Sequence, residues 1–198
     1  MATALATAGG SRVRARRGLV AVPLMAVLAV AALVMLRDGG NGAATPAARQ
    51  AVLDYHQAVH PLAVEWGKVE ILGMRPAIGD LLSGEGVPAE TIAGEARHWQ
   101  ATLASLRERL AAVPVPDGLA EAARLFDASV AEYEKAARTF ETAASTEGTA
   151  RQQGIERGID QAKAGARLYN EASMKLQTAR KLVGLGPTED FPNQPAAR

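Results

Sequence analysis

An uninterrupted apolar stretch near the N-terminus constrains this chain more than any other feature of its 198 residues. Residues 18–36 form a run of 19 residues without a charge, which is long enough for one helix to cross a hydrocarbon layer ~30 Å thick. Four arginines precede the run within residues 1–17, and only Arg37, beside Asp38, follows it closely. Because positively charged flanks stay in the cytoplasm, the sequence predicts a single-pass signal anchor at the cell membrane, with residues 1–17 cytoplasmic and the remainder extracytoplasmic.

A cleaved export signal is the alternative interpretation of this segment. Such signals usually have an apolar core of about 7–15 residues followed by a small-residue cleavage site. The run here is longer, and the small residues 42–44 lie well beyond its end. Arg16 and Arg17 suggest a twin-arginine signal, but the strongly apolar run is more typical of an anchor. We therefore expect an uncleaved anchor, with secretion after cleavage as the alternative.

Composition narrows both the fold class and the chemistry. The chain contains 42 alanines and few aromatic or β-branched residues, which favours helices over strands. It contains no cysteine, which excludes disulfides, thiolate metal sites and a lipid-modified cysteine. Arginine outnumbers lysine by 17 to 5, and with the abundant alanine this indicates a bacterial source with a GC-rich genome.

Four stretches with helical periodicity follow a glycine-rich linker at residues 37–45. Thr45 and Pro46 form a helix start, because threonine is a good N-cap and proline is favoured at the first helical position. Turn signals at residues 83–86, 114–118 and 145–148 separate the stretches, and Gly184 followed by Pro187 ends the last one. Short connections imply antiparallel neighbours. The sequence thus predicts an all-α protein in which residues 46–184 form an up-down-up-down four-helix bundle and residues 185–198 a disordered tail.

The spacing of apolar residues predicts which side of each helix faces the core. In the first stretch the face includes Trp66, Val69 and Gly73, and Pro61 is expected to bend this helix or divide it. In the last stretch the predicted face consists of Ile155, Ile159, Ala162, Ala166, Tyr169, Ser173, Leu176 and Val183. The second and third stretches show the most regular patterns. Their expected core positions are Ile92, Ala96, Trp99, Leu103, Leu106, Leu110 and Val113, then Leu119, Ala123, Phe126, Val130, Tyr133, Ala137, Phe140 and Ala144.

The sequence contains no recognised catalytic or cofactor-binding motif. Nucleotide-binding loops, the zinc-protease motif, the haem-attachment motif and the nucleophile elbow are all missing. Outside residues 1–17 and the Arg37/Asp38 pair, 17 basic residues stand against 20 acidic ones, a balance that argues against nucleic-acid binding. We therefore expect a protein that is not an enzyme, has no cofactor and binds no nucleic acid.

His56 and His60 are the first candidate site. They lie four residues apart and would project from one helix face like a pair of metal ligands. The alternative is that both are polar residues beside the helix seam. His98 is expected to lie roughly 18–24 Å away along the hairpin and to be a poor third ligand. The groups expected near this level are Asp117, Glu121, Glu171 and Met174, which leaves a His/carboxylate metal site or a His/Met haem site as a hypothesis.

Trp66 and Trp99 are the second candidate site. An antiparallel hairpin places Trp99 opposite about residue 71, so the two indoles are expected at neighbouring levels of the bundle. Aromatic residues at such positions usually fill the core. The functional alternative is a small-molecule pocket beside Trp66, Trp99 and His98, opened by the nearby glycines and proline of the first helix.

These observations lead to an expected function in the bacterial cell envelope. We expect a non-catalytic binding or interaction module that contacts the lipid bilayer through residues 18–36 and binds another envelope protein or a second copy of itself. The alternative is a bundle that binds a small molecule, a metal or haem through the His56/His60 face or the Trp66/Trp99 layer.

Overall fold

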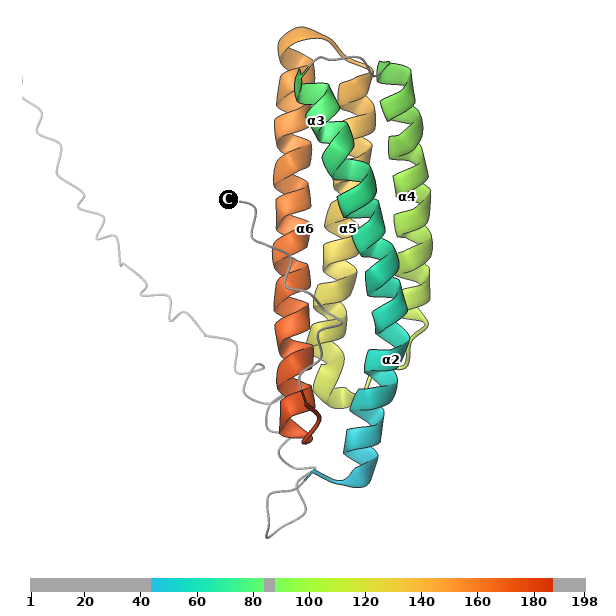
Figure 1. Ribbon diagram of the computed structural model, residues 1–198, viewed down its shortest axis with the longest axis vertical. Helices are drawn as coiled ribbons and strands as arrows, with labels where there is room; N and C mark the ends of the chain where they lie inside the picture. The colour runs from blue at the N-terminus through green and yellow to red at the C-terminus, as the bar shows by residue number, and fades with distance from the viewer. Residues whose placement is uncertain (1–43, 84–87, 187–198) are drawn as a thin grey trace, which may run out of the picture.

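The computed structural model describes residues 44–83 and 88–186, and all its elements within these ranges are helices (Figure 1). The first long helix consists of three segments joined end to end: α2 (Pro46–Lys68), the π-helical η1 (Val69–Met74) and α3 (Arg75–Ser83). Then follow α4 (Ala89–Ala111), a 3-10 turn η2 (Asp117–Leu119), α5 (Ala120–Ala144) and α6 (Gly148–Leu182). Figure 1 shows the four long helices side by side, each running opposite to the one before it. The predicted all-α four-helix bundle is confirmed.

The two ends of the bundle hold different parts of the chain (Figure 1). One end holds residue 44, residue 186 and the α4–α5 connection, and the other end holds the α5–α6 turn. The predicted cytoplasmic segment 1–17, the anchor 18–36, most of the linker 37–45 and most of the tail 185–198 lie outside the described residues. Within the described ranges, no helix combines the length and apolar character that membrane crossing requires.

Local chemistry fixes the start of the first helix and the end of the last. The Thr45 hydroxyl accepts a hydrogen bond from the backbone N–H of Ala48 at 3.2 Å, and Pro46 occupies the first turn. At the other end Gly184 adopts a φ of 73°, a left-handed conformation that glycine enters without steric cost. The N–H of Leu185 then donates to the carbonyl of Arg180 at 2.9 Å, which closes α6 as the sequence predicts.

The first helix departs from the prediction at η1 and not at Pro61. α2 continues through Pro61, whose side chain is exposed, so the helix is not divided there. The irregular part is the π-helical segment, in which each turn takes up about one residue more than in an α-helix. This wider turn brings Glu70 and Met74 into the core in place of Val69 and Gly73, which are only partly buried.

α5 and α6 approach each other closely because glycines of α6 face large side chains of α5. A Cβ added at Gly158 would lie 2.5 Å from a ring carbon of Phe140, and one added at Gly165 would lie 2.7 Å from the ring of Tyr133. The Ser129 hydroxyl also donates to the carbonyl of Gly165. Most of the predicted inward positions of α6 are buried, namely Ile155, Tyr169, Ser173, Leu176 and Val183. Ile159, Ala162 and Ala166 are only partly buried, and Gly158 and Gly165, which the apolar pattern omits, are buried.

Candidate functional site

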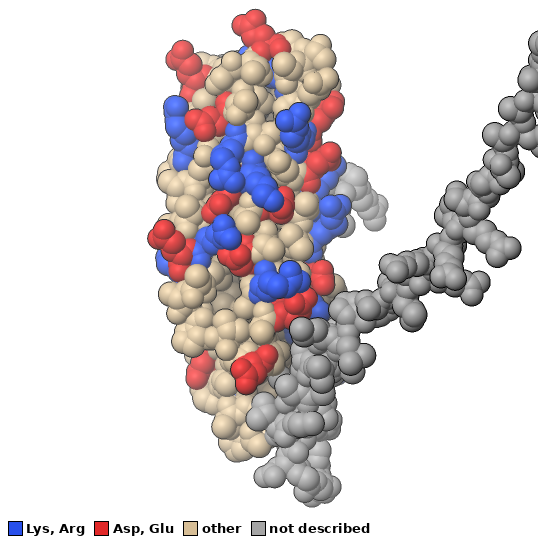
Figure 2. All heavy atoms as spheres, turned by 180° about the vertical axis from the view of Figure 1, so that it is seen from behind, with Lys and Arg blue, Asp and Glu red and all other residues tan. Residues whose placement is uncertain are grey.

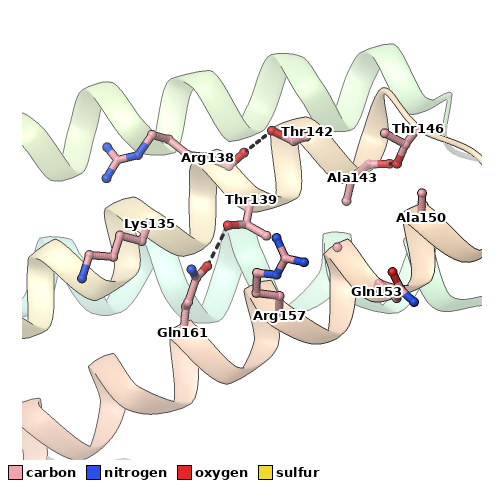
Figure 3. Close-up of a pocket in the computed structure, with 11 residues that line it drawn as sticks. Lys135, Arg138, Thr139, Thr142, Ala143, Thr146, Ala150, Gln153, Arg157 and Gln161 are labelled. Carbon is pink, nitrogen blue, oxygen red and sulfur yellow. Dashed lines mark hydrogen bonds between the residues drawn. The ribbon is translucent and has the colours of Figure 1, made fainter.

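A groove lies between α5 and α6 on the described surface. Its volume is about 500 Å³, and it lies toward the α5–α6 turn, away from the end of the bundle that holds residue 44. Figure 3 shows the side chains that line it. Those from α5 are Lys135, Arg138, Thr139, Thr142 and Ala143, and those from α6 are Ala150, Gln153, Gly154, Arg157 and Gln161. Thr146 lines the groove from the turn between the two helices.

The lining of this groove combines small residues with polar ones. Gly154 allows the two helices to approach here, because an added Cβ would lie 2.8 Å from the Cβ of Ala143. The Thr139 hydroxyl donates to the amide oxygen of Gln161 at 2.7 Å and links the two helices. Figure 3 shows Arg157 reaching from α6 toward α5 beside this bond. The groove thus combines small uncharged residues with polar and cationic groups.

The lining of the groove carries three cations and no carboxylate. Acidic residues outside the lining contact two of these cations: the Lys135 ammonium lies 2.5 Å from Glu132, and Arg138 lies 3.9 Å from Glu134. Figure 2 shows the face opposite to that of Figure 1, where basic and acidic side chains are interspersed over the middle and upper parts and fewer charges lie at the lower end. The groove is therefore a local excess of positive charge on a surface of mixed sign.

The structure brings His56 and His60 together, as their spacing predicts. Their rings are stacked, with centroids 5.9 Å apart and planes inclined by 19°. His56 is buried at 6% exposure, and His60 is partly buried. Within residues 44–83 and 88–186, no three His, Cys, Asp or Glu side chains are grouped so that they could hold one metal ion. Metal binding by the two histidines stays a prediction.

Several of the other groups considered for the histidine site are exposed. Glu171 and Met174 are exposed on α6, and Met174 retains 58% exposure, whereas His56 faces the interior. His98 is exposed on α4. The buried histidine and these exposed candidates therefore do not share one environment in the structure.

Trp66 and Trp99 are both buried in the core, at 2% and 5% exposure. The Trp66 ring makes edge contacts with Tyr133, at a centroid distance of 5.4 Å, and with Tyr169, at 4.6 Å. Trp99 packs against Gly73, where an added Cβ would lie 2.7 Å from the indole nitrogen. Each indole thus has its own packing partners, and neither lines the α5–α6 groove. A pocket at Trp66, Trp99 and His98 stays a prediction.

A buried polar cluster at η1 was not expected from the sequence. The Glu70 carboxylate, only 8% exposed, accepts hydrogen bonds from the guanidinium of Arg75 at 2.8 and 3.2 Å. Burial raises the pKa of the Tyr133 phenol, and the charge of Glu70 and a hydrogen bond to it raise that pKa further. The Trp66 indole N–H, one helical turn before Glu70, has no hydrogen-bond partner among the described residues. The π-helical turn therefore places a carboxylate in the core, beside the Tyr133 phenol.

The three tyrosines of the chain supply a prediction about alkaline pH. Burial raises the pKa of Tyr55 and of Tyr169 to about 12, and that of Tyr133 also lies above its ordinary value of 10.0. Unfolded tyrosines lose their protons near pH 10. Above that pH the folded state therefore binds more protons than the unfolded state. The free energy of unfolding is thus fully retained below pH 10 and falls as the pH rises toward 12.

The measurement is an ultraviolet titration of tyrosinate absorbance, with helix content followed in parallel. We expect almost no tyrosinate between pH 10 and the pH of unfolding, followed by ionisation that coincides with the loss of helix. Ionisation of a tyrosine near pH 10 in the fully helical protein contradicts this burial.

Comparison with known proteins finds no relative of this chain: no protein-family model matches it, and neither a curated protein nor a solved structure does. A functional assignment therefore depends on the chain's own side chains and their arrangement. The α5–α6 groove is open to solvent, and its lining holds three cationic side chains and no carboxylate.

Proposed function

We propose that this chain is a single-pass membrane protein of the bacterial envelope whose extracytoplasmic bundle is a non-catalytic binding module. The apolar run at residues 18–36 supports the anchor, and the arginines within residues 1–17 support a cytoplasmic N-terminus. Residue 44, where the described chain begins, lies at one end of the bundle. In this arrangement that end lies nearer the membrane.

The observation that carries the binding role is the position and lining of the α5–α6 groove. It opens to solvent in the half of the bundle away from residue 44, where a partner can approach without contacting the membrane. Its donor groups come from two rigid helices that glycines hold in close contact, so the site is formed before anything binds. A molecule of the envelope is the expected occupant. Pairing with another envelope protein or a second copy is compatible with this role.

Cysteine labelling tests the anchor and the groove in one experiment, because the natural chain contains no cysteine. Three variants carry the same substitution: Ala8→Cys in the N-terminal segment, Ala150→Cys in the groove and Ala104→Cys on the exposed surface of α4. In intact cells, a membrane-impermeant maleimide is expected to label Ala104→Cys but to reach Ala8→Cys only after permeabilisation. Ala150→Cys is expected to react several-fold more slowly in cells than in the purified chain.

The outcomes separate the two parts of the proposal. Labelling of Ala8→Cys in intact cells contradicts the cytoplasmic N-terminus. Equal labelling of Ala150→Cys in cells and in the purified chain, with Ala104→Cys also unchanged, means that nothing occupies the groove and contradicts the binding role.

A further inference from the structure

We infer that the α5–α6 groove binds the oxyanion of a small soluble molecule, a carboxylate or a phosphate, through Arg157. This inference rests on the proposed binding role of the groove and names the chemistry of its occupant. Three cationic side chains line the groove without any carboxylate, and the amides of Gln153 and Gln161 add further N–H donors. A lining of this kind complements a ligand that presents hydrogen-bond acceptors and negative charge.

Of the three cations in the groove, Arg157 is the one whose charge no neighbouring carboxylate among the described residues offsets. Lys135 and Arg138 each have a glutamate nearby on α5, at 2.5 and 3.9 Å, which offsets part of their charge. Arg157 makes no ion pair with any residue in the described part of the chain, and Figure 3 shows its guanidinium directed across the groove toward α5. A planar guanidinium donates two parallel hydrogen bonds to a carboxylate or a phosphate, which a lone ammonium cannot do.

The amide of Gln161 adds a second donor beside Arg157. Its oxygen already accepts the hydrogen bond from the Thr139 hydroxyl at 2.7 Å, so the position of this amide is fixed by the neighbouring helix. The NH2 group of the same amide then remains to donate to a ligand. Donors held in place in this way lose little conformational freedom on binding.

The dimensions and position of the groove favour a small soluble ligand over a lipid headgroup. A volume of about 500 Å³ matches a compact organic molecule. The groove residues of α6 end at Gln161, and the helix continues to Leu182, which is roughly 30 Å farther along its axis. In the proposed arrangement the anchor precedes residue 44 at that same end, so the groove lies in the half of the bundle farther from the point of attachment.

The test is a titration of the full-length chain in non-ionic detergent micelles, followed by its backbone amide NMR signals. The probes are inorganic phosphate and acetate, added at constant ionic strength maintained with chloride. We expect saturable shifts, confined to residues 135–161, for at least one of the two anions. Arg157→Gln is expected to weaken that binding about tenfold, the loss typical of one charge-assisted contact.

The matched control is Arg167→Gln, which removes another exposed arginine of α6 that lies outside the groove. It is expected to leave the dissociation constant nearly unchanged. Shifts that do not saturate, or that Arg167→Gln reduces as much as Arg157→Gln does, overturn the inference because they report general charge screening. Binding to phosphatidylglycerol vesicles without a response to either free anion also overturns it.

The labelling experiment distinguishes this inference from the proposed function. If Ala150→Cys is protected in cells while neither anion binds at Arg157, the groove has an occupant of another chemistry, and the oxyanion inference alone is wrong. If Ala150→Cys is not protected in cells and neither anion binds, the binding role of the groove is wrong as well.

Discussion

Replacing Trp66 with alanine is expected to lower the free energy of unfolding by about 3–5 kcal/mol, the range for deleting a large buried aromatic side chain. Trp66 is 2% exposed and lies edge-on against both Tyr133 and Tyr169, so its removal leaves a void that joins α2, α5 and α6. Helices that interact through rigid aromatic rings collapse poorly into such a void. Urea denaturation of the full chain, followed by circular dichroism and by the fluorescence of the remaining Trp99, measures the loss.

Two companion variants give this prediction its controls. Trp66→Phe keeps an aromatic ring between the tyrosines and is expected to lose less than half as much stability as the alanine variant. Leu72→Ala shortens an apolar side chain that is 71% exposed on η1 and is expected to change stability by less than about 0.5 kcal/mol. A loss for Trp66→Ala no larger than that for Leu72→Ala means that Trp66 does not hold the bundle together.

The same variant addresses the idea of a small-molecule pocket at the tryptophans. The indoles are enclosed by Tyr133, Tyr169 and Gly73, which is the environment of core side chains. If Trp66→Ala loses stability but keeps the anion response of the groove, a ligand role for Trp66 is disfavoured. Stability and binding then belong to different parts of the bundle.

The four-helix architecture could be predicted because the large apolar residues recur at helical spacing, and the burial of these residues determines how the helices pack. On α4 and α5 the buried residues include large apolar side chains at helical spacing, such as Leu103, Phe126 and Phe140, and the structure buries them where the pattern indicates. The start of the first helix at Thr45 and Pro46 and the end of the last helix at Gly184 could also be predicted, because these residues act through local backbone chemistry. Both kinds of signal depend on residues close together in the chain.

The features that sequence reasoning missed depend on backbone geometry or on contacts between helices. A periodicity of 3.6 residues carries no information about a π-helical turn, so an apolar pattern that runs through Val69 and Gly73 gives no reason to expect a buried Glu70. Gly158 and Gly165 have no side chains and so add nothing to an apolar pattern, although both face α5. The apolar pattern therefore predicts most of the inward face of α6 but omits these two points of close contact.

The groove was missed because its lining is polar, exposed and divided between two helices. Lys135 and Arg157 are 22 positions apart in the sequence, and each by itself is an ordinary surface charge. What brings them together is the register of α5 against α6, which the contacts of Gly154 with Ala143 and of Gly158 with Phe140 fix. The available signal was the run of small residues on α6, which indicates a close helix approach but not its position along α5.

Gly158→Ala is expected to destabilise the bundle by about 1–3 kcal/mol, the usual cost of adding a methyl group to a filled core. In an unconstrained helix the same change would stabilise, because alanine is favoured over glycine by roughly 1 kcal/mol. Here the added Cβ would lie 2.5 Å from Phe140, a fully buried ring between the helices, so the ring or the helix has to move. The steric cost therefore exceeds the gain in helix propensity, and the midpoint of urea denaturation is expected to fall.

Gly94→Ala provides the matched comparison, since Gly94 is also inside a long helix but an added Cβ there meets no atom within 4 Å. This variant is expected to raise stability by up to about 1 kcal/mol. Opposite signs for one chemical change in two helices isolate the α5–α6 contact from helix propensity. Stabilisation by Gly158→Ala would contradict the close approach of α5 and α6 and, with it, the register that assembles the groove. Because Gly158 lies one residue from Arg157, a shift of α6 is also expected to displace the guanidinium and weaken the anion response.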